Sequence, residues 1–495
     1  MKRILILLAF SFISLTILAQ NGFRGAYFMD GYLYGHTMNP ALYANRGYLG
    51  IATGKADVQA QSNLGLSTFY TPSTSGNAQL FLNDEISSAQ FLGKIHKNNL
   101  EDLNAQYDLF HLGFWTEKDR FHTLSISVKA SERSNIPYDF FRFLKEGTTD
   151  GNLYDLGGFG GRARAYAQVA YGMSVPVTDE IRVGAKIKAL VGLAYMDLDY
   201  SRMDLMLDRD RWTISSEASL VSSNIPSRET AGPQMINEIY NLDNYNWKDF
   251  RPSGYGAAID LGATWQVLPW LQLSASLLDI GLIRWNLNNR MASIGNFDYT
   301  GFKDLDLSGE GSIMAQIDEV KDEVYSLARF QKAETGSPTD MLPITGYLGV
   351  KAQPCSWFSA GLLGTGRAEG KYSWAEIRGA LNLEPTHWLG LTAGAAYGTF
   401  GPKLSSALNF RLALMSIFIG AEASSLHLAA NMNGEDVRLK AVFDPNNDTI
   451  LIPRDNLNMH LTFGVNMVFG RKIRPGSSPR KIAPVVLPPN EEEML

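Results

Sequence analysis

Stretches in which apolar side chains alternate with small or polar ones fill most of this sequence. The clearest covers residues 255–267, where every second residue from Tyr255 to Val267 is apolar, while Gly256, Asp260 and Gln266 stand among the residues between them. Successive side chains of a strand point to opposite faces. This stretch therefore predicts a strand with one apolar face and one polar or small face.

The composition excludes a helical membrane protein and does not suit an ordinary soluble one. The mean hydropathy of -0.11 is too low for a helical membrane protein. Beyond residue 20 no apolar run reaches the roughly 18 residues that a spanning helix needs. The charged fraction of 19% is below the roughly 25% usual for soluble domains. A closed sheet needs apolar residues only at alternate positions and leaves no backbone unpaired in lipid. We therefore expect an all-β fold, a transmembrane antiparallel β-barrel.

Short turns and long loops alternate along the chain. Short turns are predicted at residues 116–120, 177–180, 268–270, 354–357, 385–388 and 415–416, and long polar segments at 60–106, 131–161, 200–253, 286–341 and 423–457. Two further connections on the long-loop side are short, near residues 370–371 and 400–403. This asymmetry is typical of outer-membrane barrels, whose short turns face the periplasm and whose long loops lie outside the cell.

The alternation predicts about 14 strands. We place them at residues 48–59, 107–116, 120–130, 162–176, 181–199, 255–267, 270–284, 342–353, 357–369, 373–384, 388–399, 404–414, 416–423 and 459–469. Residues 211–221 are expected to pair with the outer part of 181–199 as a ribbon. Segments 84–100, 137–146 and 314–333 are expected to be helical.

Four tryptophans stand at the edges of the short turns, namely Trp115, Trp270, Trp357 and Trp388. Because the Trp ring is apolar and its N–H remains hydrated, Trp gathers at membrane interfaces. We interpret these four as one aromatic girdle. The strands of a soluble β-sandwich or propeller also alternate apolar and polar residues, but such a fold would need neither the tryptophan girdle nor the asymmetry of turn lengths.

The chain divides into four parts. Residues 1–19 are predicted to be a signal peptide, with Lys2 and Arg3 before an apolar stretch and Ala19 at the cleavage point. Residues 20–47 form an N-terminal hatch or plug segment, 48–470 the barrel, and 471–495 a disordered periplasmic tail. The expected location is the outer membrane of a Gram-negative bacterium. The net charge of -6 is mild and indicates no nucleic-acid partner.

The polar face of the strands would line the lumen, because a charge facing lipid at mid-depth costs about 2–4 kcal/mol. Basic residues predominate there and could bind an anionic head group. The predicted ligand-binding residues are Arg162, Arg164, Arg182, Lys186, Lys188, Asp260, Glu376 and Arg378. The alternative is that these groups pair with one another and with an interior plug. Simple alternation would point Asp279 at lipid, so a bulge is expected there.

Small residues fill the inward face of 388–399, which suggests that the N-terminal segment packs against it. That segment contains Asn39, Pro40 and Ala41, a tripeptide that resembles the Asn-Pro-Ala signature in the hatch of FadL-like outer-membrane transporters. The resemblance implies a fourteen-stranded barrel with an N-terminal plug that carries fatty acids and other hydrophobic molecules. Residues 256–267 and 274–285 also resemble an uncharacterised family of outer-membrane barrels from Bacteroidota-type bacteria.

Catalytic motifs are missing from the sequence. It contains no HExxH, P-loop, GxSxG or CxxC pattern, so we expect no catalytic site, no metal site, no cofactor and no enzymatic activity. The favoured function is an outer-membrane channel for small hydrophobic or amphipathic molecules, with outer-membrane lipid and the transported molecule as partners. The alternative is a non-transporting barrel that serves as an accessory or scaffold subunit of a secretion or surface-assembly complex and binds a protein partner through its outer loops.

Overall fold

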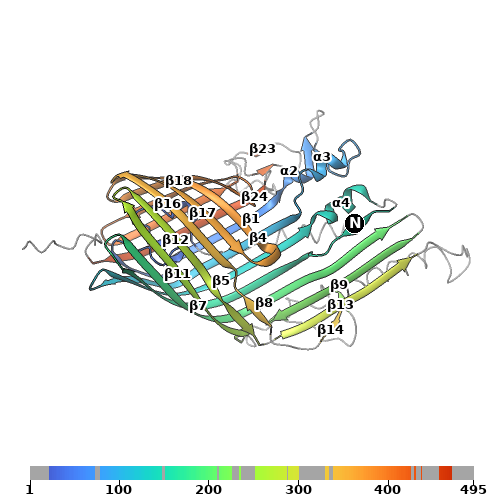
Figure 1. The fold of residues 1–495 in the computed structure, drawn as a ribbon, viewed down its shortest axis with the longest axis horizontal. Helices are drawn as coiled ribbons and strands as arrows, with labels where there is room; N and C mark the ends of the chain where they lie inside the picture. Colours follow the sequence, from blue (N-terminus) through green and yellow to red (C-terminus); the bar gives the residue numbers. More distant parts are fainter. Residues whose placement is uncertain are drawn as a thin grey trace, which may run out of the picture.

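Fourteen antiparallel strands close into a barrel (Figure 1). The computed structural model describes residues 22–72, 78–147, 151–208, 211–225, 234–235, 251–286, 288–299, 329–333, 338–424, 429–430, 436–437 and 456–470. The predicted signal peptide and the predicted tail lie outside the described residues. Among the residues that are described, no helix is long and apolar enough to cross a membrane.

All fourteen predicted barrel strands are present, several of them longer than expected. They are β1 (Gly47–Gly65), β4 (Asn98–Thr116), β5 (Arg120–Pro137), β7 (Gly160–Pro176), β8 (Ile181–Leu207), β11 (Gly254–Leu268), β12 (Leu271–Trp285), β16 (Ile344–Cys355), β17 (Phe358–Ala368), β18 (Trp374–Thr386), β19 (Leu389–Gly398), β20 (Lys403–Arg411), β21 (Met415–Ala423) and β24 (Asn456–Phe469). The predicted all-β fold class, a transmembrane antiparallel β-barrel, is confirmed.

The barrel closes at β1, which pairs with β4 on one side and with β24 on the other. Residues 47–49 lie opposite 467–469, and residues 56–61 lie opposite 458–463, with a register shift between the two blocks. Each of the fourteen strands is thus hydrogen-bonded along both edges. Complete pairing is what a sheet surrounded by lipid requires, because lipid offers no partner to a free N–H or C=O.

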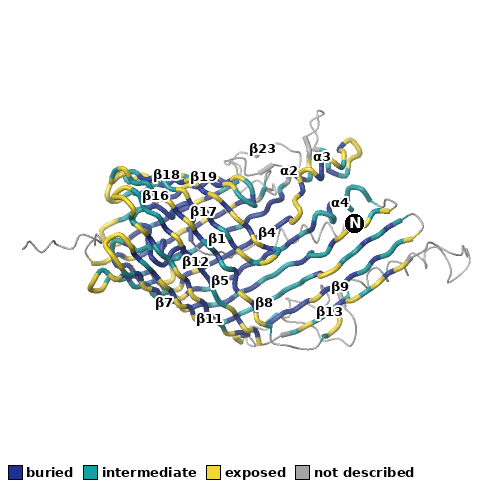
Figure 2. The backbone as a smooth tube through the Cα atoms, in the orientation of Figure 1, coloured by how far each residue is buried: buried dark blue, intermediate teal, exposed yellow. Residues whose placement is uncertain are grey.

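The two faces of the wall differ as the alternation predicted. On β11, Tyr255, Ile259, Leu261 and Trp265 are 43–57% exposed, whereas Ala258, Asp260 and Thr264 are at most 6% exposed. Figure 2 shows the same alternation of exposed and buried residues along the other barrel strands. An apolar outer face on a closed barrel is the architecture of outer-membrane proteins.

The tryptophan girdle is confirmed at three of its four positions. Trp270, Trp357 and Trp388 are 41–55% exposed on the outside of the barrel at its short-turn end. The prediction is wrong for Trp115, which packs against Tyr43 and donates its indole N–H to the carbonyl oxygen of Ala44 at 2.8 Å. Burial of an indole N–H needs such an acceptor, and the N-terminal segment provides it.

A bulge in β12 turns Asp279 into the lumen, as expected from the sequence. The register between β11 and β12 shifts between Ile259 and Leu261, and Asp279 adopts a φ of 59°. Its side chain is only 1% exposed. The extra residue reverses the alternation beyond it, so that Ile283 and Trp285 also become buried.

Strands continue beyond the barrel at the long-loop end (Figure 1). The outer part of β8 pairs with β9 (Trp212–Ser223), β9 with β13 (Asn288–Tyr299), β13 with β14 (Arg329–Lys332), and β14 with β10 (Gln234–Met235). We call this the outer sheet. It confirms the predicted ribbon. Two short strands extend the wall at the same end, namely β6 (Leu153–Asp155) beside β8 and β15 (Thr339–Met341) beside β12.

Helices are fewer and shorter than predicted. The segment 137–146 forms α4 (Tyr138–Glu146) as expected. In 84–100 only α3 (Ser88–Leu92) is helical, because residues from Asn98 onward pair with β5. In 314–333 the four residues of β14 are extended and 314–328 lie outside the described residues. The turn predicted at 415–416 lies at 412–414 instead.

The remaining short elements lie near these helices or apart from the barrel. They are α2 (Leu66–Phe69), a hairpin of β2 (Tyr70–Pro72) and β3 (Ala78–Leu80), and a pair formed by β22 (Ala429–Ala430) and β23 (Asp436–Val437).

The apolar outer face generates a first prediction. Leu348 lies near the middle of β16 and is 70% exposed, so Leu348→Lys would place a charge in lipid and lower the free energy of unfolding by about 2–4 kcal/mol. Urea titration of the protein refolded into phospholipid vesicles measures this change. The same substitution at Leu153, 56% exposed on β6, is the control, with an expected change within about 0.5 kcal/mol. Equal effects at both positions would contradict a lipid-facing β16.

Candidate functional site: a plugged lumen

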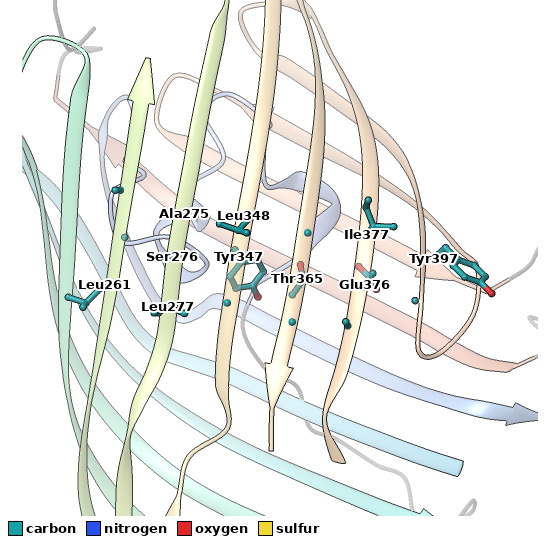
Figure 3. A pocket seen from close by; sticks show the side chains of 17 residues that line it. Leu261, Ala275, Ser276, Leu277, Tyr347, Leu348, Thr365, Glu376, Ile377 and Tyr397 are labelled. Carbon is teal, nitrogen blue, oxygen red and sulfur yellow. The ribbon is translucent and has the colours of Figure 1, made fainter. Parts of the chain in front are cut away.

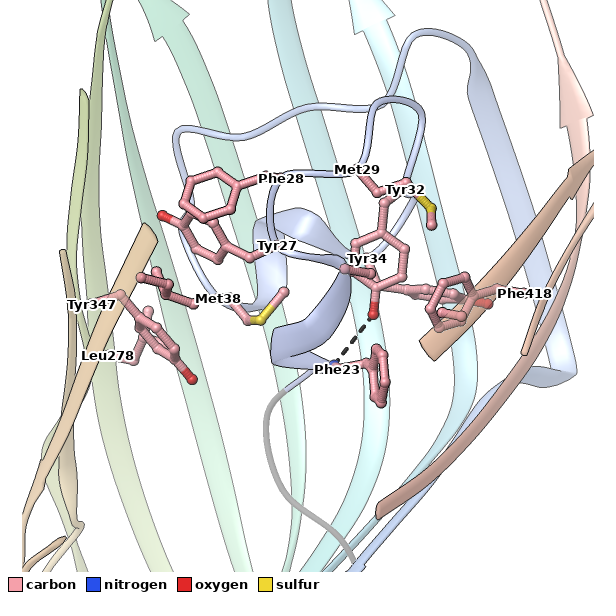
Figure 4. Close-up of a cluster of buried hydrophobic side chains, with 13 residues drawn as sticks. Phe23, Tyr27, Phe28, Met29, Tyr32, Tyr34, Met38, Leu278, Tyr347 and Phe418 are labelled. Carbon is pink, nitrogen blue, oxygen red and sulfur yellow. Dashed lines mark hydrogen bonds between the residues drawn. The ribbon is translucent and has the colours of Figure 1, made fainter. Parts of the chain in front are cut away.

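Residues 22–46 fold inside the barrel, and we call them the plug. Two short 3-10 turns, η1 (Arg24–Ala26) and η2 (Gly35–Thr37), organise it. A hydrogen bond inside the plug joins the backbone N–H of Phe23 to the side-chain oxygen Tyr32 Oη at 3.3 Å (Figure 4). Its apolar core packs against wall residues in one buried cluster formed by Phe23, Tyr27, Phe28, Met29, Tyr32, Tyr34, Met38, Leu278, Tyr347, Leu363, Ala407 and Phe418.

The small residues of β19 lie against the plug, as the sequence indicated. Thr392 Oγ1 donates to the carbonyl oxygen of Gly25 at 3.1 Å. A Cβ atom added to Gly390 would lie 3.6 Å from Met29 Sδ. The absence of large side chains on this strand thus leaves room for the plug backbone.

The Asn39–Pro40–Ala41 tripeptide forms a tight contact between plug and wall. Asn39 is fully buried and donates from Nδ2 to Tyr27 Oη at 3.1 Å and to the carbonyl oxygens of Ala263 and Ala275 at 3.2 and 3.3 Å. Its Oδ1 accepts the backbone N–H of Ala41 at 2.9 Å. One side chain therefore fixes the turn and binds it to both β11 and β12.

Two wall glycines make this contact possible. A Cβ atom on Gly184 would lie 2.1 Å from the carbonyl carbon and oxygen of Pro40, and one on Gly262 would lie 2.1 Å from Asn39 Oδ1. Real Cβ atoms do not approach other heavy atoms so closely. Any larger residue at either position would displace the tripeptide from the wall.

Lys186 binds the plug at His36. Its ammonium group donates to the carbonyl oxygen of His36 at 3.0 Å and to the Nδ1 atom at 3.2 Å. Because an ammonium group only donates, the proton of neutral His36 is on Nε2, which lies 2.9 Å from His111 Nε2 and 2.8 Å from Tyr48 Oη. Burial, with Lys186 adding to it, holds the pKa of His36 well below its usual 6.5.

Lys188 and Asp260 form one buried ionic cluster with Asp279. Lys188 Nζ lies 2.6 Å from Asp260 Oδ1 and 2.5 Å from Asp279 Oδ1. Asp260 Oδ1 also accepts the backbone N–H of Asp279 at 2.8 Å. The bulge at Asp279 thus supplies a second carboxylate to an ammonium group that is only 6% exposed.

Glu376 and Arg378 belong to a second cluster, which includes a residue of the plug. Glu376 lies within 2.8 Å of both Arg378 and Lys403, and 3.4 Å from Arg24 Nε in η1. Arg378 in turn lies 2.6 Å from Glu422. Arg24 also lies over the ring of Trp374, at 4.8 Å from the ring centre.

Arg182 lies at the short-turn end and contacts both plug and wall. It donates to the carbonyl oxygen of Asp119 at 2.7 Å and to that of Ser174 at 3.1 Å. Its guanidinium group lies over the ring of Tyr43 in the plug, 4.7 Å from the ring centre. The cation is thus satisfied by carbonyl oxygens and a π face.

Arg162 and Arg164 lie at the long-loop end, where the segment 369–373 crosses the lumen. We call this segment the crossing loop; it joins β17 to β18 and contains η5 (Gly370–Tyr372). Glu369 lies 2.8 Å from Arg164 on β7 and 2.8 Å from Arg133 on β5, strands on the opposite side of the barrel. Arg162 pairs with Asp197 at 2.8 Å, and Lys371 pairs with Asp199.

The eight predicted ligand-binding residues all face the lumen or its mouth, but they do not form one site. They divide among four places: the plug contacts of Arg182 and Lys186, the cluster of Lys188 with Asp260, the cluster of Glu376 with Arg378, and the long-loop end with Arg162 and Arg164. All are engaged with plug, wall or crossing loop in this structure. Their binding of a ligand stays a prediction.

Sequence reasoning missed several partners of these residues. Arg133, Asp340, Glu422, Arg24 and Glu369 were not among the predicted site residues. For Arg133 and Glu422 the signal was present, since both continue the inward alternation of their strands. No sequence pattern placed Glu369, because its position depends on a loop that crosses to distant strands. Among the described residues, no group of three or more His, Cys, Asp or Glu side chains could hold a metal ion.

An apolar groove of about 1020 Å³ lies on the lipid-facing side of the wall (Figure 3). Its rim includes Leu261, Leu348, Ile377 and Tyr397, which are 46–70% exposed. Its floor is formed by small outward-facing residues, among them Gly346, Gly364, Gly366 and Ala375. The exposed part of the groove therefore faces lipid, and its lining also includes Tyr347 and Glu376, which contact the plug.

A closed barrel with an apolar belt, a polar lumen and an N-terminal plug defines the chain as a plugged transmembrane β-barrel protein. A family model described as a family of unknown function (DUF5723) matches residues 40–422. The chain belongs to this family. No curated protein matches the sequence significantly.

The solved structures to which the barrel is similar include a FadL homologue, the family whose Asn-Pro-Ala signature the sequence resembles. The fold is similar to that of a Pseudomonas aeruginosa FadL homologue, with 11% identity over 92% of this chain and 99% of that one and a TM-score of 0.43. It is also similar to the toluene transporters TbuX of Ralstonia pickettii (9% identity, 92% and 96% covered, TM-score 0.38) and TodX of Pseudomonas putida (8%, 92% and 99%, TM-score 0.38).

The contact at Gly184 generates a second prediction. Gly184→Ala would force the plug turn away from β8 and destabilise plug docking by about 1–3 kcal/mol, the usual effect of overpacking. Limited proteolysis of the folded protein in detergent should then cut residues 22–46 faster. Gly366→Ala is the matched control, because nothing lies within 4 Å of a Cβ added there. Unchanged cleavage of the Gly184→Ala plug would contradict the tight contact.

The environment of His36 generates a third prediction. The docked plug keeps His36 neutral because its pKa is well below 6.5, whereas a displaced plug would bind a proton near pH 6.5. Since the displaced state binds more protons below that pH, docking should weaken by about 1.4 kcal/mol, or tenfold, per pH unit as the pH falls from 6.5.

Protease cleavage of the plug at pH 7.5, 6.5 and 5.5 measures this effect. His36→Gln should flatten the pH dependence, since Gln does not titrate, whereas His122→Gln, on the outside of β5, should leave it intact. A plug whose accessibility is the same at all three pH values would rule out His36 as the titrating group.

Proposed function

We propose that this protein is an outer-membrane channel for small hydrophobic or amphipathic molecules and that the plugged structure is its closed state. The single observation that carries the proposal is the plug itself. A barrel of about eight strands is filled by its own side chains, and wider ones leave a channel or enclose a plug. Fourteen strands therefore enclose a lumen that the plug fills.

The chemistry of the plug supports an apolar or amphipathic solute. The side of the plug that packs against the wall carries mainly aromatic and Met side chains. A molecule that takes the place of such contacts must itself be apolar over part of its surface. The inward Arg and Lys side chains, chiefly Arg162, Arg164, Lys186 and Lys188, supply binding partners for an anionic head group.

The outer sheet favours a second candidate function. It projects beyond the barrel rim (Figure 1) and presents side chains that lipid cannot cover, such as Ile294 on β13, which is 76% exposed. A surface of this kind suits a protein partner. In that case the barrel would be a scaffold or accessory subunit of a secretion or surface-assembly complex, and the plug would never move.

Locking the plug separates the two functions and gives a fourth prediction. Ser174 Oγ donates to the carbonyl oxygen of Ala41 at 2.8 Å, so Ala41→Cys with Ser174→Cys, in a Cys355→Ser background, should form a disulfide between plug and β7. Cells that express the native chain should take up toluene and decanoate faster than cells without it. The oxidised lock should reduce uptake to the level of cells without the protein.

A reductant supplies the matched control, because it should restore uptake in the same cells, and gel mobility verifies that the disulfide forms. Gly184→Ala, with its loosened plug, should increase uptake where Gly366→Ala does not. Uptake that does not depend on the native protein would refute the channel and leave the scaffold as the remaining function.

A further inference from the structure

The long-loop end of the lumen contains an anion site built from arginines. Arg133 Nε lies 2.8 Å from one carboxylate oxygen of Glu369, and Arg164 Nη1 lies 2.8 Å from the other. All three side chains are at most 3% exposed. Both contacts are ion pairs by charge and distance, and neither directs an N–H at the carboxylate oxygen within hydrogen-bond geometry. Two guanidinium groups around one carboxylate still supply the charge that a carboxylate ligand requires.

Glu369 belongs to a network of ion pairs at this end of the lumen. Among the described residues, four arginines form ion pairs with four carboxylates there, namely Arg133, Arg162, Arg164 and Arg367 with Asp102, Asp197, Asp340 and Glu369. The three aspartates belong to strands β4, β8 and β15. Glu369 alone is carried by a loop, so it is the carboxylate that can leave without breaking the wall.

Besides Glu369, the loop is held by one ion pair, by a contact with Arg162, and by the burial of Tyr372 in a cluster with Leu100, Trp374 and Phe400. Lys371 pairs with Asp199 on β8, and Arg162 lies over the ring of Tyr372, 5.8 Å from its centre. Opposite charges outweigh the effect of burial and hold the pKa of Glu369 below its usual range. Glu369 therefore remains an anion, and its removal would leave a buried positive charge without its partner.

Apolar groups with unused polar atoms lie beside the arginines. Tyr372 and Trp374 form a buried cluster with Leu100 and Phe400, and each of the two is 4% exposed. Tyr372 Oη and Trp374 Nε1 make no hydrogen bond within the described part of the chain. Buried polar atoms of this kind usually have a partner, so they point to a polar atom that a ligand would bring.

We propose that Arg133 and Arg164 form the binding site for the carboxylate of an amphipathic molecule, and that Glu369 occupies this site as an internal competitor. The incoming carboxylate replaces Glu369 between the two guanidinium groups, and its apolar part takes the place of Tyr372 against Trp374 and Phe400. Replacement frees the crossing loop, which opens the long-loop end. This inference rests on the proposed channel function and adds to it a ligand class and a releasing step.

Binding of decanoate to the purified full-length protein in nonionic detergent tests the proposal. Glu369→Gln removes the competing charge and should tighten decanoate binding, measured by isothermal titration calorimetry at pH 7.5, by about tenfold or more. Decanol, which has the same chain and no charge, should bind both proteins within about twofold. Adding Arg164→Gln to Glu369→Gln should abolish the gain for decanoate.

Lys371→Gln provides an independent variant in case Glu369→Gln does not fold. It weakens the loop contact with Asp199 but leaves both arginines and Glu369 in place, so decanoate should bind more tightly and decanol should not change. Equal gains in affinity for decanoate and decanol would mean that the loop is only a steric cover. No gain in decanoate affinity in either variant would mean that Glu369 is a fixed part of the wall. Both outcomes overturn the proposal. Toluene uptake by cells with the native protein tests the channel separately, since toluene has no charge.

Discussion

Closure of the sheet is the constraint on which the rest of this structure depends. A sheet in lipid must pair every edge, and β1 achieves this by bonding to β4 and β24 at once. A ring of fourteen strands encloses more space than inward side chains can fill. That space holds either water or an internal partner, and here residues 22–46 fill it. The glycines at 184 and 262 follow from the same requirement, because the Asn39–Pro40–Ala41 turn reaches the wall only where side chains are missing.

Charge is the second constraint. The lipid side of the wall disfavours charged groups, so the inward positions receive most of them, and an enclosed lumen desolvates them. The buried charges form ion pairs along the lumen. Lys188 pairs with two aspartates, Glu376 with Arg24 of the plug, and Arg164 with Glu369 of the crossing loop. The ionic contacts thus join the two movable elements to the fixed wall. Departure of the plug leaves Glu376 with Arg378 and Lys403, whereas departure of the crossing loop takes a carboxylate away from two buried arginines.

The sequence predicted the repeating part of the structure and missed what depends on long-range contacts. Alternation located all fourteen strands and predicted the inward-facing charged residues that were named on them, because lipid imposes the same rule on every strand. It also identified Asp279 as a break in that rule, which the bulge in β12 explains. Trp115 departs from the girdle because the plug offers its indole an acceptor, and residues 98–100 are extended because β5 pairs with them. Neither partner is close in sequence. The ion pairs of Glu369 could not be predicted for the same reason, because its partners on β5 and β7 lie more than two hundred residues earlier in the chain.

The two barriers in the lumen are held by different forces, and this difference constrains what can open them. The plug is held by apolar packing and by hydrogen bonds around Asn39 and His36, so an apolar molecule competes with it directly. The crossing loop is held by the ion pairs of Glu369 and Lys371 and by the burial of Tyr372, and apolar contact offers the buried arginines no replacement for a lost carboxylate. A neutral hydrocarbon therefore competes with the plug alone. A molecule with a carboxylate head and an apolar tail matches both barriers, which makes such an amphiphile the solute that the lumen as a whole fits best.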